Sequence, residues 1–334
     1  MINVNEQLIQ ACGGGNPEKV AFLLSDKASG GTIDIHYCYD AAFHEACCRG
    51  HLNVLRVLVQ YENKNESFTK KIKYFFRKRV KKVYKDKINA GFLRAYKQKV
   101  NRSFLLACQN GHLDVAQYLL TSEELKYRAD IGLCDEALFL ACGRGRLNVV
   151  QYLLTSKDLK KNANIHTRGN GAVLEACKYG HFDIVKYLLT GILPEDGGSR
   201  PKQEYWVDAT EKPRELATVY GALESASRHG WLDIVKFFME DENIKDKVDL
   251  HEDNDAALLG AIDCNREDAA LYLAQFYTIE KMKIFLEKFK AKFLQENLLV
   301  QKLMQETDIL EQKSVLEEGI NVHGKEPLGK TLSM

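Results

Sequence analysis

The chain repeats itself at a fixed interval, and this repetition limits its fold more than any other feature. The segment from Ala107 to Leu120 has close copies on both sides, and the alanine that opens each copy falls at positions 11, 46, 107, 141, 176, 226 and 261. Successive alanines are 35, 61, 34, 35, 50 and 35 residues apart, so the period is 34 to 35 residues with two insertions. Such a period predicts a solenoid of stacked units, because one unit cannot bury its apolar face alone.

Each copy predicts two short antiparallel helices joined by a tight turn. In the third copy the first helix should end at Gly111, because glycine tolerates the left-handed conformation that such a turn requires. Apolar residues then follow at helical spacing and predict a second helix. The residue after the glycine is a histidine in several copies, namely His51, His112 and His181. Its fixed position predicts a structural hydrogen bond in each repeat, since the copies are too far apart to share a metal ion.

The pattern Ala-x-x-x-Gly-His-Leu-Asp-Val-x-x-Tyr-Leu-Leu closely resembles ankyrin repeats, as does the connector Asn162-Ala163-Asn164-Ile165. The resemblance covers roughly residues 3–275. It implies an all-α ankyrin-repeat solenoid of about seven helix-turn-helix repeats, and a non-enzymatic scaffold that binds a protein partner through its concave surface and insertions. The family's Thr-Pro-Leu-His opening is missing throughout. Ala42-Phe43-His44-Glu45 and Ala172-Val173-Leu174-Glu175 stand in its place, which leaves the start of each first helix open.

The amino-acid sequences of the repeats are similar to those of ankyrin-repeat proteins of intracellular bacteria and of large amoebal viruses. Glutamates upstream of Leu332 resemble the tails of substrates of type IV secretion. This resemblance implies an effector that a bacterium secretes into the host cytosol, where its partner is a host protein. We otherwise expect a cytoplasmic protein, because no apolar run approaches the ~20 residues that span a bilayer and residues 1–10 do not look like a secretory signal.

The first insertion predicts a basic helical segment over residues 66–99. Residues 70–99 hold 13 Lys and Arg, Lys99 included, against the single acid Asp86; their charge of +12 leaves −11 for the remainder of a chain of net charge +1. Apolar residues at three- and four-residue steps predict an amphipathic helix, a turn near Asn89-Ala90-Gly91 and a second helix. The candidate binding residues of this segment are Lys70, Lys71, Arg77, Lys78, Arg79, Lys81 and Lys82.

Different interpretations of this basic segment stay open. Its apolar stripe can pack on the solenoid and leave the lysines as a solvated face. Alternatively, the cations can bind an acidic protein partner or anionic lipid headgroups, so that peripheral membrane binding is the alternative function. We expect no nucleic acid as partner, because no recognised nucleic-acid-binding fold accompanies the charge.

The remaining chain outside the repeats divides into three segments. Residues 191–220 form the second insertion within an array that covers residues 1–278, and their prolines and glycines predict an irregular loop. The aromatic pair Tyr205 and Trp206 in this loop either anchors a partner or pins its own loop. Residues 279–318 predict helices that cap the array, with a coiled-coil dimer as the rival, and residues 319–334 predict a flexible tail.

No constellation for catalysis, cofactors or metals is found. Motifs for metalloproteases, serine hydrolases, phosphate loops and dinucleotide sites are absent from the sequence. Five of the nine cysteines share one repeat position, which predicts small buried side chains rather than ligands or disulfides: Cys12, Cys47, Cys108, Cys142 and Cys177. We therefore expect no catalytic residue, no metal and no cofactor, and a monomer.

Overall fold

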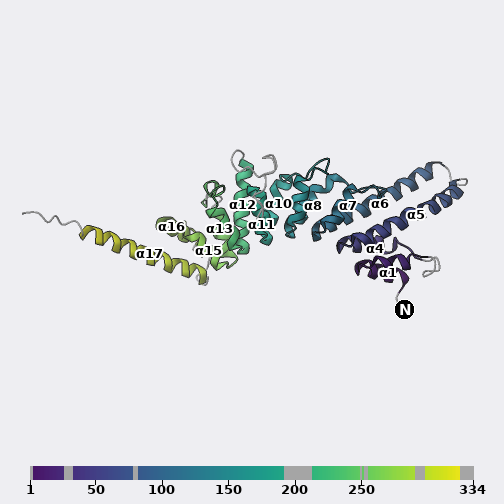
Figure 1. Cartoon of the computed structure of the whole chain (residues 1–334). Coiled ribbons are helices and arrows are strands. Elements are labelled where there is room, and N and C mark those ends of the chain that lie inside the picture. Colours follow the sequence, from purple (N-terminus) through teal and green to yellow (C-terminus); the bar gives the residue numbers. More distant parts are fainter. Residues whose placement is uncertain are drawn as a thin grey trace, which may run out of the picture. The chain divides into compact units, whose positions relative to one another are not determined.

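The computed structural model describes residues 3–25, 33–77, 82–191, 213–248, 250–251, 255–289 and 298–323. In these ranges the chain forms helices and no strands (Figure 1). Its internal contacts divide it into two compact units, Met1–Thr218 and Val219–Met334. The predicted all-α class is confirmed. Most of the second insertion, with Tyr205 and Trp206, and the end of the tail lie outside the described residues.

In the described residues of unit 1, the α-helices of the repeats form five pairs. The first helices of the pairs contact one another in succession, as α1 contacts α4, α4 contacts α6, α6 contacts α8 and α8 contacts α10. This arrangement is the stack that the period of 34 to 35 residues predicts. The pairs are α1 (Val4–Gly13) with α2 (Pro17–Leu23), α4 (Tyr37–Cys48) with α5 (Leu52–Arg77), α6 (Lys82–Asn110) with α7 (Leu113–Thr121), α8 (Cys134–Gly143) with α9 (Leu147–Thr155), and α10 (Thr167–Tyr179) with α11 (Phe182–Thr190).

Unit 2 holds two further pairs and the C-terminal helices. The pairs are α12 (Pro213–His229), whose residues from Val219 onward belong to this unit, with α13 (Leu232–Glu240), and α14 (Ala256–Asp263) with α15 (Glu267–Ala274). Helix α17 (Leu298–His323) contacts α15 and α16 (Ile279–Phe289) and buries Leu299 and Leu303. That α16 and α17 cap the array stays a prediction.

A recurring side-chain hydrogen bond joins the turn of one repeat to the preceding repeat. The residue after the turn glycine, or after Asn265 in the seventh repeat, bonds to a backbone carbonyl at the end of the preceding first helix. A carbonyl oxygen only accepts, so the ring Nε2 or the guanidinium Nε must donate. The pairs are His51 with Gly13 (3.0 Å), His112 with Cys48 (2.9 Å), Arg146 with Gln109 (3.3 Å), His181 with Gly143 (3.2 Å) and Arg266 with Arg228 (3.3 Å). The structural role predicted for the three histidines is confirmed.

The first helices of the second, fifth and seventh repeats begin with a His–Asx turn that the sequence analysis did not predict. In each, a ring Nδ1 lies close to the side-chain oxygen of an Asp or Asn four residues later, and that Asp or Asn has a left-handed backbone with φ near 60°. The side-chain hydrogen bond offsets part of the cost of this conformation. The pairs are His36 with Asp40 (2.6 Å), His166 with Asn170 (2.9 Å) and His251 with Asp255 (2.9 Å). Three of the first helices that lack the Thr-Pro-Leu-His opening thus begin with a turn of this kind.

The predicted turn near Asn89-Ala90-Gly91 is wrong. Helix α6 continues through these residues, and α5 runs without a break from the second repeat to Arg77. A glycine inside a helix costs only about 1 kcal/mol, and no proline interrupts the segment. The chain therefore runs out along α5 and back along α6 (Figure 1), and both helices are prolonged repeat helices. We call residues 64–77 of α5 and 82–98 of α6 the arm.

The turn glycines allow a test of the contact between repeats. Gly50 has φ +75°, and a Cβ there would lie 2.4 Å from Nδ1 of His112. Gly169 has φ +63°, but its Cβ would meet nothing within 4 Å. Both alanine variants incur the left-handed backbone penalty of about 1–2 kcal/mol, and only Gly50→Ala also displaces the histidine. We predict that Gly50→Ala lowers the free energy of unfolding by at least about 1 kcal/mol more than Gly169→Ala does. Urea denaturation measures this difference, and equal losses would contradict it.

Candidate protein-binding surface

A buried lysine lies where the arm leaves the repeats. The Nζ atom of Lys99 is 3.0 Å from both carboxylate oxygens of Glu62, and 3.9 Å from Oδ1 of Asp40. It also lies 4.3 Å and 4.6 Å from the ring centres of Tyr96 and Phe43, which are cation–π distances. Only 3% of the Lys99 side chain is exposed. Lys99 therefore does not belong to the basic surface, although its charge was counted there.

His36 extends this cluster at its solvent side. Its Nδ1 lies 2.6 Å from Asp40, and its Nε2 lies 3.8 Å from Oε1 of Glu62. The hydrogen bond to Asp40 raises the pKa of His36, and burial and the charge of Lys99 oppose this shift. When His36 is protonated, the cations His36 and Lys99 balance the carboxylates of Asp40 and Glu62 in the cluster.

The connector after the third repeat is attached to the base of the arm. Asn63 on α5 donates from Nδ2 to the carbonyl of Glu124 at 2.9 Å. Tyr96 on α6 packs edge-on against Tyr127, with ring centres 5.8 Å apart. The phenol of Tyr118 donates to the Glu124 carboxylate at 2.9 Å. These contacts hold the connector against helices of two successive repeats.

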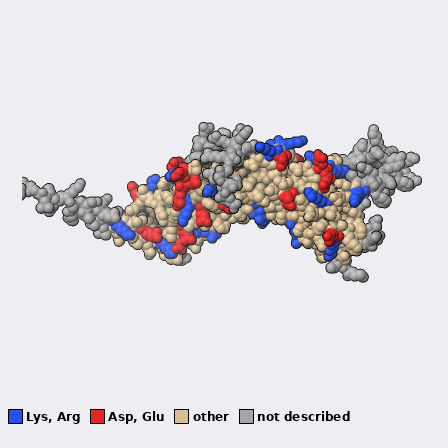
Figure 2. Space-filling model, viewed as in Figure 1, with Lys and Arg blue, Asp and Glu red and all other residues tan. Residues whose placement is uncertain are grey.

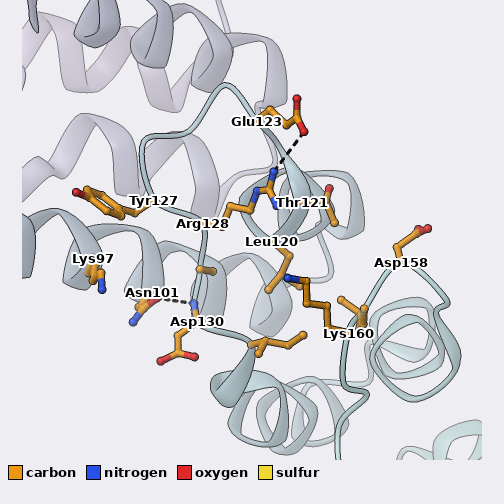
Figure 3. A pocket seen from close by; sticks show the side chains of 13 residues that line it. Lys97, Asn101, Leu120, Thr121, Glu123, Tyr127, Arg128, Asp130, Asp158 and Lys160 are labelled. Atoms are coloured by element: carbon orange, nitrogen blue, oxygen red, sulfur yellow. Dashed lines mark hydrogen bonds and ion pairs between the residues drawn. The ribbon is translucent and has the colours of Figure 1, made fainter.

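This connector forms one side of a groove of about 850 Å³. Helix α6 supplies another side with Lys97 and Asn101, and the connector after the fourth repeat supplies Asp158 and Lys160 (Figure 3). In the view of Figure 3, the side chain of Lys160 points toward that of Leu120. The full lining is Lys97, Asn101, Leu120, Thr121, Glu123, Tyr127, Arg128, Ala129, Asp130, Ile131, Asp158, Leu159 and Lys160.

Some polar side chains of the groove have a hydrogen-bond or ion-pair partner within the protein, and others do not. Arg128 donates to the carbonyl of Ser122 at 3.0 Å and lies 3.8 Å from Glu123. The backbone amide of Asp130 donates to Oδ1 of Asn101 at 2.9 Å, and the Asp130 carboxylate accepts from the backbone amide of Gly132. By contrast, neither Lys97 nor Lys160 forms an ion pair with a described residue. The Nζ atom of Lys97 lies 5.6 Å from the ring centre of Tyr127, and both ammonium groups remain without a carboxylate partner among the described residues.

A repeated hydrogen bond fixes the connectors on the first helices. A backbone amide of the connector donates to an Asn or Asp side chain 29 residues earlier, in the preceding first helix. The pairs are Asp34 with Asn5 (3.0 Å), Asp130 with Asn101 (2.9 Å) and Asn164 with Asp135 (2.7 Å). The groove between such connectors is therefore built from ordered backbone, and a partner need not order it.

The structure leaves the predicted binding residues untested. Lys70, Lys71, Arg77 and Lys82 lie on the helices of the arm, where only the backbone is described. Lys78, Arg79, Lys81, Tyr205 and Trp206 lie outside the described residues. On the described residues that face the viewer in Figure 2, cations and acids are interspersed. The sequence did not predict that Lys97 and Lys160 line one groove, because 63 positions separate them. The only indication in the sequence was that Lys97 lies in a predicted helix and Lys160 in a predicted connector.

The described residues offer little to nucleophilic or metal chemistry. No group of three or more His, Cys, Asp or Glu in the described ranges could hold a metal ion. The cysteines at the shared repeat position are fully buried, and burial raises the pKa of Cys12 and of Cys47 to about 12, so both stay protonated. Within the same ranges, no helix is both long and apolar enough for a membrane span.

Comparison with known families identifies the repeats. Residues 104–196 match the family model of ankyrin repeats in three copies. The match covers most of the third to fifth repeats and the groove lining from Leu120 to Lys160, whereas Lys97 and Asn101 lie before it. The chain thus contains ankyrin repeats in an all-α repeat solenoid. A search of curated protein sequences found no match to this chain. Ankyrin repeats are generally modules for protein–protein interaction, and proteins built from them are typically non-enzymatic.

The His36 turn predicts a pH dependence of stability. The pKa of His36 is raised in the folded protein, so its contribution is fully present below its unfolded pKa of about 6.5 and is lost as the pH rises through the folded pKa. We predict that the stability difference between the native protein and His36→Gln shrinks from pH 6 to pH 8. His166→Gln is the control, since the partner Asn170 carries no charge. Thermal unfolding at both pH values measures the difference, and a pH-independent His36→Gln effect would refute the prediction.

Proposed function

We propose that this protein is a non-enzymatic scaffold that binds a segment of another protein in the groove beside the arm. The observation that supports it best is the combination of an ordered groove with two lysines that have no carboxylate partner among the described residues. Leu120, Ile131 and Leu159 add apolar surface to the lining. A preorganised groove with apolar surface and few polar groups suits an extended peptide, because little entropy is lost in ordering the site.

The groove lining itself is neutral, because Lys97, Arg128 and Lys160 are matched by Glu123, Asp130 and Asp158, so the charge of the arm is what favours an acidic partner. Lys97 and Lys160 can pair with carboxylates, and the arm brings further cations close to Lys97 on the same helix. Without the buried Lys99, residues 70–98 carry 12 cations and the acid Asp86, a charge of +11. Such a concentration of charge accelerates the encounter with an acidic segment and disfavours basic ones.

The groove is tested with a matched pair of charge reversals. The protein is used to capture partners from eukaryotic cytosol, and the affinity of a captured partner is then measured by calorimetry. We predict that Lys97→Glu/Lys160→Glu weakens binding at least tenfold, because both contact points become repulsive. Lys157→Glu/Lys161→Glu changes the charge equally in one of the same connectors but outside the groove lining, and it should change affinity less than threefold. Equal effects of both variants, or none, would reject the groove as the site.

Peripheral binding to anionic lipids is the second candidate function, supported by the charge of the arm. Each Lys or Arg near an anionic leaflet contributes about 1 kcal/mol. Vesicles that contain phosphatidylserine should then pellet the protein at low salt, and neutral vesicles should not. A variant with Arg77, Lys78, Arg79, Lys81 and Lys82 all changed to Glu should stay in the supernatant. A native protein that does not pellet with acidic vesicles removes this function.

The origin of the protein is a separate proposal. We propose that the protein is an effector that a type IV system secretes and that its partner is a host protein. This proposal rests on the amino-acid sequences of the repeats and of the C-terminal tail. A translocation assay with a reporter fused to the chain tests this: a bacterium with the secretion system should deliver the fusion into host cells, and an isogenic strain without it should not.

A further inference from the structure

The ion pair between Lys99 and Glu62 joins two successive repeats. Glu62 lies on α5, which belongs to the second repeat, and Lys99 lies on α6, which belongs to the third. Asp40, from the first helix of the second repeat, is also near the ammonium group, at 3.9 Å. Burying the ammonium group of Lys99 costs desolvation free energy. Burying the carboxylate of Glu62 without a cationic partner would cost free energy too. The bidentate contact and the two aromatic rings offset this cost in one geometry only.

This pair lies at the junction between the repeats and the arm. Glu62 is two residues before the arm begins on α5, and Lys99 is the first residue after it ends on α6. The two helices of the arm start from different repeats, so any change in the distance between those repeats is transmitted to the arm. Lys99 and Glu62 fix this distance at the point where the helices leave the array.

The same cluster is coupled to the groove. The ammonium group of Lys99 lies over the ring of Tyr96, and the same ring packs edge-on against Tyr127 of the connector. Asn63, next to Glu62, binds the backbone of that connector. Lys97, two residues before Lys99, lines the groove and has its Nζ 5.6 Å from the ring centre of Tyr127. A movement of Lys99 would therefore shift both the arm and one side of the groove.

We propose that Lys99 and Glu62 form an ionic lock that holds the arm and the adjoining groove connector in one fixed arrangement. The arm is then a rigid element of the array and presents its cations at a constant position. Breaking the lock releases the arm and the connector together, while the fourth and fifth repeats stay folded. Its importance for partner binding rests on the proposed function, but the lock itself is measured on the free protein, so the two can fail separately.

Hydrogen exchange measured by mass spectrometry tests the lock. The variants are Lys99→Met, Glu62→Gln and the double variant, and the control is Arg94→Met, an exposed cation of the same helix. We expect each single variant to speed exchange at least tenfold in residues 64–77, 82–98 and 122–131, with residues 134–190 unchanged. The double variant should be no faster than the worse single one, because both changes remove the same interaction. Arg94→Met should leave all segments unchanged.

Several outcomes would overturn the proposal. Unprotected arm amides in the native protein would show that the arm is not held. Unchanged exchange in the arm and connector of Lys99→Met, or an increase spread evenly over the chain, would show that the pair is no local lock. Effects of the two single variants that multiply in the double variant would show that Lys99 and Glu62 act independently. If Lys99→Met does not fold, Glu62→Gln decides alone, since it keeps the shape of the side chain and removes the charge.

Discussion

The hydrogen bond from the turn of one repeat to the last carbonyls of the preceding first helix is the contact on which the array depends. Helices of seven to thirteen residues, such as α2 and α10, are marginal in isolation, and their terminal carbonyls have no partner within the helix. An imidazole or guanidinium from the next repeat satisfies one of these carbonyls and at the same time sets the register of the stack. The turn glycine is required because any side chain there would occupy the space of that donor.

The register of the repeats also determines where the arm and the groove lie. The arm consists of one helix from the second repeat and one from the third, so its base reflects the spacing of those two repeats. The groove is lined by connectors after the third and fourth repeats together with α6. Both features are therefore properties of neighbouring repeats, and no single repeat contains either of them.

Features that recur with the period were predictable from the sequence. The positions of the turns, the buried cysteines and the bonding role of His51, His112 and His181 all follow from comparing copies. Features that occur once or depend on distant partners were not. The burial of Lys99 depends on Glu62, 37 positions away, and on Asp40, 59 positions away, so a count of charges includes a lysine that is not on the surface. Asn89-Ala90-Gly91 has the composition of a turn, but the cost of a glycine in a long helix is too small to end it. The His–Asx turns could have been found, because His and Asp or Asn recur four residues apart before three first helices.

Nuclear magnetic resonance of the histidine rings tests the contact between repeats most directly. In a spectrum that correlates ring nitrogens with their protons, we predict that His51, His112 and His181 each show a proton on Nε2 that exchanges slowly with water, because this proton is donated to a backbone carbonyl. If these three rings instead interconvert between tautomers and lose their protons to solvent as fast as a free imidazole does, the hydrogen bonds are not formed, and the account of how the repeats are held in register is wrong.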